Sequence, residues 1–450
     1  MTGLALALSA FALMLVAIFL RVPVALAMGL TGFFGSWYVL GTVAAPLAQM
    51  KTLAYETFSN QGLSIIPLFL LMGQFATRTG MSGALFKAAS DWLGHRKGGI
   101  AMASVGACAG FGAICGSSLA TASTMGQVAL PEMRKRGYSD SLSTGVLAAG
   151  GTLGILIPPS IILVIYAIMA EQNIVKMFMA ALIPGLLAAL GYILTVAIYV
   201  RLRPDAADTA ERVPMRARIR TLAATWPVIA IFGLTMGGIV GDWNWARPGP
   251  QALFTPNEAA AFGAFATGLY GVLTRRLTWR GFVEAILETA KATGMIFFIL
   301  LGAEVLKGFL AVTRAPDMLA DWVVTQGFAP LAVLVVLLLA YLLFGCVMDS
   351  LSMILLTIPI FLPVIEVLDF GLSAEDTAIW FGVLALIVVE VGLITPPVGM
   401  NLFIINGVAR DIPIARTYAG VAPFVLSDLI RVAILVAAPS ITLWLVHAAF

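Results

Sequence analysis

Long apolar runs follow one another along almost the whole chain, separated by short polar or charged segments. Most runs hold about 20 residues, the length that an α-helix needs to cross the hydrocarbon core of a bilayer. The pattern therefore predicts an all-α polytopic membrane protein. The expected apolar elements are 3–20, 22–40, 59–77, 99–131, 140–170, 180–200, 226–240, 257–273, 282–312, 328–365, 377–409 and 417–447.

The composition agrees with this pattern. Hydrophobic residues make up 60% of the 450 residues, and only 11% of the residues are charged. A soluble protein of this length could not cover its surface at that charge density. The first run, 3–20, has no basic residues before it and no small-residue cleavage site before Arg21. We therefore expect it to be a retained span rather than a signal peptide.

Two pairs of adjacent prolines interrupt apolar runs that would otherwise form continuous helices. The first pair lies in GILIPPSII at 154–162 and the second in GLITPPVGM at 392–400. A proline inside a helix costs roughly 3 kcal/mol, and each backbone carbonyl freed in hydrocarbon adds a further penalty. Such breaks persist where the freed carbonyls line a cavity or bind a cation. The alternative is that the prolines only kink packed spans.

The sequence before each proline pair is repeated in the two halves of the chain. ASDWLG at 89–94 corresponds to LADWVV at 319–324, and GSS at 116–118 corresponds to GCVMDS at 345–350. Each half therefore holds a helical hairpin followed by a broken span. We predict an N-terminal scaffold at 1–58, a first repeat at 59–200 with hairpin 99–133 and broken span 140–170, a loop and connecting scaffold spans at 201–280, and a second repeat at 281–450 with hairpin 328–365 and broken span 377–409.

Basic residues predict which side of the membrane each loop occupies, because Lys and Arg collect in cytoplasmic loops. The basic clusters are 96–97, 134–136, 201–220 and 275–280. If all four are inside, each hairpin enters and leaves on one side, the first from the cytoplasm and the second from outside. The two repeats are then inverted, an arrangement common in secondary transporters. Segments 242–256 and 313–327 and both termini are expected outside, although charge alone does not distinguish re-entrant hairpins from pairs of full spans.

Residues that usually carry catalysis or bind transition metals are scarce. The chain has two histidines, His95 and His447, and its three cysteines lie in apolar sequence, where we expect small buried side chains. No G-x-x-x-x-G-K-[ST] motif occurs, so the chain does not hydrolyse ATP through a P-loop. An intramembrane serine protease built on Ser117 or Ser118 would need a nearby base, and neither histidine is placed for that role. We therefore expect a protein that is not an enzyme.

Five segments resemble the signature blocks of one family: GSSLATASTMGQVALPEMRKRGY, AAGGTLGILIPPSIILVIYA, FTPNEAAAFGA, MDSLSMILLTIPIFLPVI and EVGLITPPVGMNLFI. The resemblance spans about 4–447 and is to the large membrane subunit of tripartite ATP-independent periplasmic (TRAP) transporters. It implies the elevator fold of the ion-transporter superfamily and sodium-coupled import of an organic acid across the bacterial inner membrane, where the charge pattern places both termini in the periplasm. It also implies two partners, a periplasmic substrate-binding protein and a small four-span membrane subunit.

A standalone sodium/organic anion symporter or antiporter of the same superfamily is the alternative function. Such a protein would share the hairpins and broken spans but would need no binding protein. Within the TRAP family the binding protein selects the substrate. This sequence therefore does not identify the organic acid, and a C4-dicarboxylate is only a default.

We predict one sodium ion at each break, held against the neighbouring hairpin. Hydroxyl, carbonyl and carboxylate oxygens suit a hard cation, and two inverted sites would supply about two coupling ions. The predicted Na⁺ ligands are Ser117, Ser118, Gly154 and Ile157 at the first break, and Asp349, Ser350, Gly392 and Thr395 at the second. Ser118 and Asp349 are also predicted to contact the substrate, and the resemblance implies the same role for Ser160.

Each polar candidate also has a structural interpretation. Ser117 and Ser118 could form a small-residue contact between helices, and Ser160 could hydrogen-bond to its own helix. Asp349 could cap a helix that begins at Ser350. Asp349 is nevertheless the strongest candidate, because acids within a membrane are costly and usually functional.

Other charged residues carry weaker signals. Glu390 lies two residues before Gly392 and is a second candidate acid at that break. Glu304 and Lys307 are three residues apart on 282–312, and we expect them to neutralise each other. The basic tract at 201–220 is longer than a connecting loop requires, and the pattern offers no explanation for it.

Overall fold

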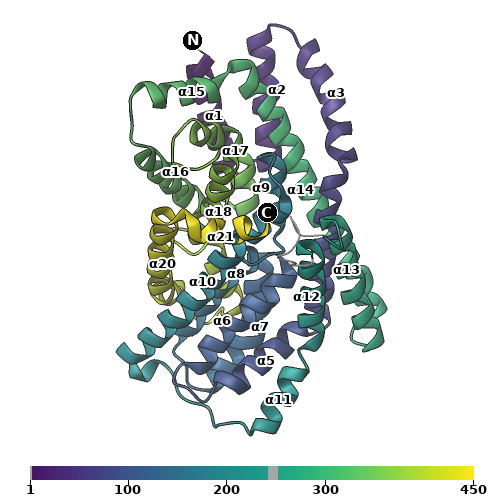
Figure 1. Ribbon diagram of the computed structural model, residues 1–450, viewed down its shortest axis with the longest axis vertical. Helices are drawn as coiled ribbons and strands as arrows, with labels where there is room; N and C mark the ends of the chain where they lie inside the picture. Colours follow the sequence, from purple (N-terminus) through teal and green to yellow (C-terminus); the bar gives the residue numbers. More distant parts are fainter. Residues whose placement is uncertain (1–2, 242–251) are drawn as a thin grey trace.

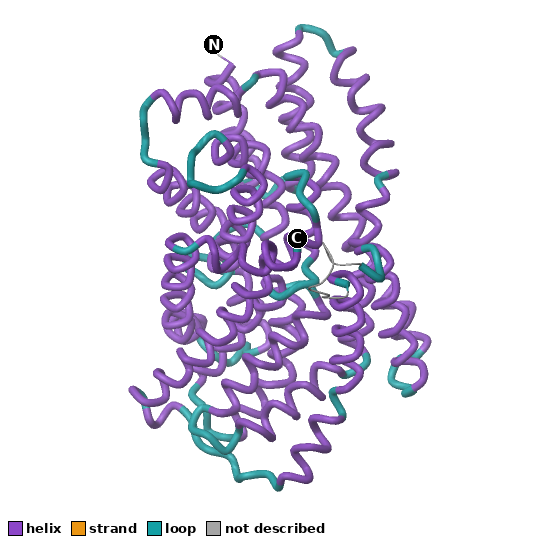
Figure 2. The backbone as a smooth tube through the Cα atoms, viewed as in Figure 1, coloured by secondary structure: helices purple, strands orange, loops and turns teal. Residues whose placement is uncertain are grey.

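A computed structural model describes residues 3–241 and 252–450, and every regular element within those ranges is a helix (Figures 1 and 2). The predicted all-α fold is therefore confirmed. The chain starts with α1 (Gly3–Phe19), α2 (Val24–Leu40), α3 (Ala44–Ser59) and the 3-10 turn η1 (Gln61–Ser64). The first half continues with α4 (Ile65–Arg78), α5 (Met81–Leu93), α6 (Gly99–Cys115), α7 (Ser118–Lys135), α8 (Asp140–Leu156), α9 (Ile161–Met169) and α10 (Ile174–Leu202).

The second half follows a connecting region. The connection consists of η2 (Pro204–Ala206), α11 (Met215–Ala223), α12 (Trp226–Val240) and α13 (Pro256–Leu273). The remaining helices are α14 (Trp279–Thr313), α15 (Ala315–Thr325), α16 (Pro330–Gly345), α17 (Ser350–Glu366), α18 (Ala374–Gly392), α19 (Met400–Val408), α20 (Ile414–Ala437) and α21 (Pro439–Ala449).

The two halves repeat the same order of elements. A short helix, α5 or α15, carries the repeated Asp-Trp segment and precedes a hairpin, α6–α7 or α16–α17. A broken helix comes next, α8–α9 or α18–α19, followed by a long helix, α10 or α20. In Figure 1 the first hairpin lies in the lower part of the molecule and the second in the upper part. The predicted inverted repeat of hairpin and broken span is thus present.

The proline pairs lie in both helix breaks, as predicted. Helix α8 ends at Leu156 and α9 begins at Ile161, with a bend of 46° between them. A proline cannot donate the backbone hydrogen bond that would continue the helix. Helix α9 instead restarts at Ser160, whose hydroxyl accepts from Leu163 N at 3.4 Å. The second break, between Gly392 and Met400, is longer.

Three described helices are long and apolar enough to cross a membrane: α10, α14 and α20. Two bent pairs, α8–α9 and α11–α12, extend this number to five if each pair forms one span. Helices α3 and α11 lie in segments for which hydropathy predicted no element, because polar residues interrupt their apolar character. The predicted single run 417–447 is wrong, since the helix ends at Ala437 and a new one begins at Pro439, a residue that favours the first turn of a helix.

Helices α2 and α14 pack closely because small residues line their contact. A side chain at Gly32 would lie 2.5 Å from the Val305 carbonyl oxygen, and one at Gly302 would clash with the Ala25 carbonyl oxygen. Small residues let helix backbones approach where the hydrophobic effect does not drive helices together. This contact fixes the position of α14 beside the hairpins.

The basic loops gather at one end of the molecule. Ala210 N donates to Gly94 O at 2.9 Å, and Ser139 N donates to Ala206 O at 2.9 Å. At the same end Arg134 forms an ion pair with Asp411 at 2.7 Å, and its hydrogen bonds lower the pKa of that carboxyl below its usual value. The loops 94–98, 136–139 and 203–214 therefore share one side, as the charge pattern predicted.

Both ends of the described chain lie beside the acidic loops. Helix α1 starts next to Thr313, and His447 of α21 pairs with Asp376 at 2.9 Å. Val323 of α15 packs with Val364 of α17, which joins these two acidic regions. Both described ends of the chain therefore contact elements that adjoin the acidic loops; the placement of the termini opposite the basic loops, and in the periplasm, stays a prediction.

Cysteine labelling tests that assignment. We expect an impermeant thiol reagent to label Ala252→Cys in intact cells but to label Thr209→Cys only after the membrane is opened. Thr209 is exposed, whereas Ala206 in the same loop is buried and unsuitable. The native cysteines are buried, which keeps background labelling low. Labelling of Thr209→Cys in intact cells would overturn the orientation. Residues 242–251 of the predicted periplasmic segment 242–256 lie outside the described residues.

Candidate functional site

The tips of both hairpins meet at one cavity of about 180 Å³. Ser117 and Ser118 reach it from the first hairpin, and Asp349 and Ser350 reach it from the second. Apolar side chains supply most of the remaining wall, from α4, α9 and α14. This volume lies below the roughly 300–1,000 Å³ of drug-sized ligand sites, so the cavity suits a small molecule or ions.

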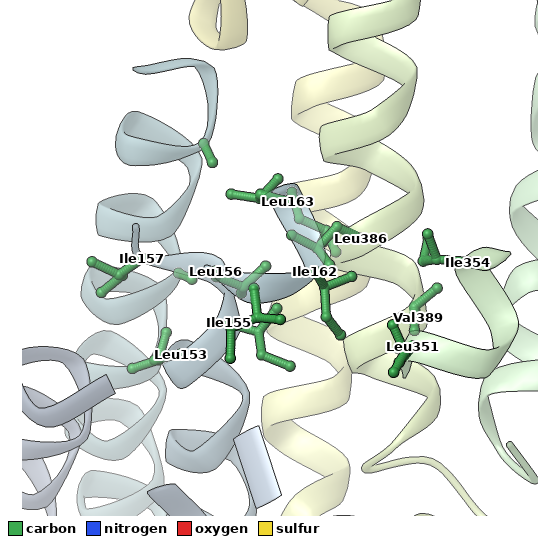
Figure 3. Close-up of a cluster of buried hydrophobic side chains, with 14 of the residues drawn as sticks. Leu153, Ile155, Leu156, Ile157, Ile162, Leu163, Leu351, Ile354, Leu386 and Val389 are labelled. Atoms are coloured by element: carbon green, nitrogen blue, oxygen red, sulfur yellow. The ribbon is translucent and has the colours of Figure 1, made fainter. Parts of the chain in front are cut away.

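Buried apolar residues surround the first break. Figure 3 shows Ile155 and Ile162 on its two sides, with Leu351 of α17 and Val389 of α18 across from them. The dielectric constant of such an environment is low, which strengthens the interaction of any ion with nearby oxygen atoms. The same environment raises the cost of leaving a polar group unpaired.

Two hydroxyls at the first hairpin tip have no hydrogen-bond partner among the described residues. They belong to Ser118 and Thr121, and both side chains are buried. Ser117 differs from them, because its hydroxyl accepts from Ala120 N at 3.4 Å and caps α7. Buried polar atoms are nearly always paired in proteins. Ser118 lies near the Glu390 carboxyl and Thr121 near the Cys115 thiol, and both hydroxyls keep lone pairs that a ligand could use.

Gly154 of α8 faces this group of oxygens. A side chain added at Gly154 would clash with Thr121 Oγ1 and would lie 2.8 Å from the Ser117 carbonyl oxygen. The hairpin therefore packs directly on the Gly154 backbone, which brings α8 against the oxygens of two residues, Thr121 and Ser117. This donor set fits a hard cation such as Na⁺. The fit includes Thr121, which is not among the ligands predicted from the sequence.

Gly154, Ile157 and Ser160, three predicted residues of the first break, do not line the cavity wall. Ile157 donates its backbone N–H to Leu153 O at 3.2 Å, and its side chain lies against Gly185 of α10. Ser160 is fully buried and accepts from Leu163 N, which matches its structural interpretation as a residue that bonds to its own helix. Roles of Ile157 in sodium binding and Ser160 in substrate binding stay predictions.

Asp349 combines the two interpretations that the sequence left open. Its Oδ1 accepts from Ser352 N at 3.0 Å, and its Oδ2 accepts from the Ser352 hydroxyl, so it caps α17. The same side chain is half-buried and lines the cavity. A carboxylate has about four lone-pair sites. Capping therefore leaves acceptor capacity for a cation.

Glu390 lies between the two hairpins and is more prominent than its sequence signal indicated. It is 1% exposed, and its Oε1 accepts from the Ser350 hydroxyl at 2.6 Å. Its Oε2 has no partner among the described residues, and the Ser118 hydroxyl lies close by without completing a hydrogen bond. A buried carboxylate without a cationic partner is expensive. A bound cation would offset part of that cost.

The second break docks on the tip of the second hairpin. Gly392 packs on Gly345 so closely that a side chain at Gly392 would lie 2.6 Å from the Gly345 Cα. Gly399 N donates to Cys346 O at 3.0 Å, and the Thr395 hydroxyl donates to Val391 O at 2.6 Å. Thr395 and Gly392 do not line the cavity, so their roles as sodium ligands stay predictions. The prolines of this break are exposed, whereas those of the first break are buried.

The expected neutralisation of Glu304 by Lys307 is wrong, because these two described residues form no ion pair within 4.0 Å. A buried pair occurs instead on α20, where Arg431 lies 2.9 Å from Asp428. Tyr192 donates to Asp428 at 2.7 Å. This pair was not predicted from the sequence. Its signal was an acid and an arginine three residues apart within the apolar run 417–447.

The two serines at the first tip offer a sharp test. We expect Ser118→Ala to raise the sodium concentration for half-maximal uptake by about tenfold, since a hydrogen-bonding group to an ion contributes about 1.5–3 kcal/mol. Stability should not change, because the Ser118 hydroxyl makes no hydrogen bond in the described structure. Ser117→Ala should lower stability by about 1 kcal/mol through loss of the cap. Ser123→Ala, on the same helix, is the matched control. An unchanged sodium dependence of uptake in Ser118→Ala would show that Ser118 is not a sodium ligand.

Comparison with known proteins places these features in a wider group. The family model described as "Tripartite ATP-independent periplasmic transporter, DctM component" matches residues 11–441. The C4-dicarboxylate TRAP transporter large permease protein DctM of Pseudomonas aeruginosa is 34% identical over 391 residues, which cover 86% of this chain and 87% of that protein. The isethionate TRAP transporter permease protein DctMQ of Oleidesulfovibrio alaskensis is 30% identical over 395 residues, which cover 88% of this chain and 59% of that protein.

A solved structure shares the fold. The crystal structure of the YdaH transporter of Alcanivorax borkumensis, described as having an unusual topology, superposes with a TM-score of 0.63. The match covers 86% of this chain and 87% of that chain at 16% sequence identity. At this identity the likeness concerns the arrangement of the helices and not the ligands.

Proposed function

This chain belongs to the DctM component family of tripartite ATP-independent periplasmic transporters, and we propose that it forms the large membrane subunit of a sodium-coupled importer of an organic acid. The observation that carries the proposal is the cavity at which both hairpin tips meet, with unpaired hydroxyl oxygens on one tip and a carboxylate on the other. A tripartite system needs two further components, a periplasmic binding protein that delivers the acid and a small membrane subunit.

The oxygens at the two tips would hold the coupling ions. Ser118 and the hydroxyl of Thr121, which packs against Gly154, form the first group, and Asp349 with Ser350 forms the second. Bound Na⁺ supplies positive charge that offsets the negative charge of the substrate. One elementary charge is worth about 2.3 kcal/mol per 100 mV, so a dianion needs at least about two Na⁺ to cancel its electrical penalty.

The substrate would lie between the same tips. Helices α7 and α17 both begin at the cavity, and the positive ends of helix dipoles favour an anion. Ser118 and Asp349 are the residues that we assign to the border between ion and substrate. The named relatives carry a C4-dicarboxylate or isethionate, and both are small anions. We therefore propose an organic acid as the class and leave its identity to the binding protein.

The wall opposite the tips supports an elevator mechanism. Leu70 of α4 and Met295 and Ile296 of α14 form an apolar surface against the hairpins. A surface without hydrogen bonds or ion pairs to break lets packed elements slide past one another. Helix α14 is held by its close contact with α2, so we propose that the hairpins and broken helices move while α2 and α14 stay in place.

Reconstitution with separate components tests the proposed function. We expect uptake into proteoliposomes only when this chain, the small subunit and the loaded binding protein are all present, and we expect the small subunit to co-purify. Omission of each component in turn is the control. Sodium-driven uptake of free organic acid by this chain alone would support a standalone symporter instead.

A further inference from the structure

Helix α11 carries an exposed apolar stripe although it lies at the charged end of the molecule. Met215, Ile219 and Leu222 are 59%, 56% and 45% exposed. Their spacing of four and three residues places them on one face of the helix. Helix α11 is bent by 45° from α12, so this face does not continue straight along the span. In Figure 1, α11 is at the lower end, next to the basic loops.

Unpaired arginines flank the stripe. Arg212, Arg216 and Arg220 are exposed, and none of them forms an ion pair with another residue in the ranges that the structure describes. Arg216 and Arg220 are four residues apart and therefore share a face that borders the apolar stripe. An apolar face beside an arginine-rich face is typical of helices that lie in the membrane interface.

The third face of α11 is anchored to the protein. Arg218 is buried, its carbonyl oxygen accepts from Trp92 Nε1 at 3.2 Å, and its Nη2 lies 3.4 Å from His95 Nδ1. These contacts dock α11 on α5 and on the loop that follows it. The anchoring fixes the direction of the other two faces. Because α11 is held in one orientation, its apolar stripe and its exposed arginines point away from the rest of the described protein.

We propose that α11 lies in the membrane interface and binds the headgroups of anionic phospholipids. The apolar stripe would enter the acyl boundary while Arg212, Arg216 and Arg220 contact phosphate groups, for which arginine provides matching donors. Trp226, 63% exposed at the junction with α12, is of the residue type that gathers at membrane surfaces. The exposed Ile229 continues the apolar surface along α12.

The apolar surface of α11 continues onto α12, and this continuity favours lipid over a soluble protein as the partner of the α11 stripe. The exposed side of α12 is apolar, and α11 and α12 together are long and apolar enough to form one bent span. The stripe on α11 extends that surface to the level of the basic loops, where anionic headgroups complement the arginines. The basic tract within 201–220 then has a role beyond setting topology. It ties the start of the first repeat, through α5, to the bilayer surface.

Lipid association of the full chain tests the charge part of the proposal. The chain is placed in nanodiscs of phosphatidylcholine with phosphatidylglycerol, and the enrichment of phosphatidylglycerol at the protein is measured. The variant Arg212→Gln/Arg216→Gln/Arg220→Gln should bind phosphatidylglycerol about a hundredfold more weakly, at about fivefold per arginine. Lys135→Gln/Arg136→Gln is the matched control, because these exposed residues lie at the same end and pair with Glu132. Equal enrichment in the triple variant and the original chain would overturn the proposal.

A depth measurement tests the apolar part. A fluorophore on Ile219→Cys should be quenched by lipids brominated near the headgroup, and one on Thr209→Cys should not. Equal quenching at the two positions would contradict an interfacial α11. Loss of quenching at Ile219→Cys when the small subunit is added would show that protein covers the stripe, and it would equally overturn the assignment to lipid.

Discussion

Both Asp349→Ala and Asp349→Asn should abolish sodium-driven uptake, although only the first removes the cap of α17. Asn caps helices about as well as Asp does, whereas Ala costs about 1 kcal/mol at this position. Removing one charged partner from a buried ion site costs about 3–5 kcal/mol, a loss of at least about a hundredfold in affinity. The pair of variants therefore separates the proposed cation-binding role of Asp349 from its capping role, which the structure shows.

Uptake and stability are measured side by side for this pair. We expect Asp349→Asn to keep the thermal stability of the original chain and its complex with the small subunit, and to take up no substrate at any sodium concentration. Full uptake by Asp349→Asn together with reduced stability of Asp349→Ala would contradict a cation-binding role and show that Asp349 only caps α17.

Gly154→Ala should reduce uptake to background, because the added methyl group would collide with Thr121 Oγ1 and the Ser117 carbonyl oxygen and displace the oxygens of the first group. Gly106→Ala on α6 of the same hairpin is the matched control, since a side chain there would meet no atom within 4 Å. Helix propensity should make the control neutral or slightly stabilising. Only the first variant should lose sodium binding, measured by sodium-dependent protection of the chain against thermal unfolding.

A second variant guards against a Gly154→Ala chain that does not fold. Thr121→Val keeps the shape of the side chain and removes its hydroxyl oxygen, so packing should be preserved while sodium affinity falls. A Gly154→Ala chain with normal uptake, or a Thr121→Val chain with an unchanged sodium dependence, would remove this group of oxygens from the coupling mechanism.

The positions of hairpins and breaks could be read from the sequence because they depend on local chemistry. A proline pair ends a helix wherever it occurs, and the repeated Asp-Trp and Gly-Ser segments marked the order of elements in both halves. Helix α11 was missed because a search for apolar runs passes over a helix that is rich in charged residues. Its arginines lower its mean hydropathy, and the stripe at Met215, Ile219 and Leu222 is visible only by helical spacing.

The partners of the site residues depend on distant contacts and could not be predicted. Thr121 looks like a packing residue until Gly154 is placed against it. Glu390 of α18 looks like an isolated acid until Ser350, at the tip of the hairpin in the same repeat, donates to it from 40 residues away. No periodicity in a single sequence fixes such pairs, since they arise from the docking of each hairpin on the broken helix of its own repeat.

The central claim is that sodium ions held at the two hairpin tips drive uptake. The most direct measurement is the initial rate of uptake by the complete reconstituted system at varied sodium concentration, with the pH gradient held at zero and then imposed without sodium. We predict a steep, saturable rise with sodium that reflects about two ions, and no uptake from the pH gradient alone. Uptake that ignores sodium and follows the pH gradient would contradict the account.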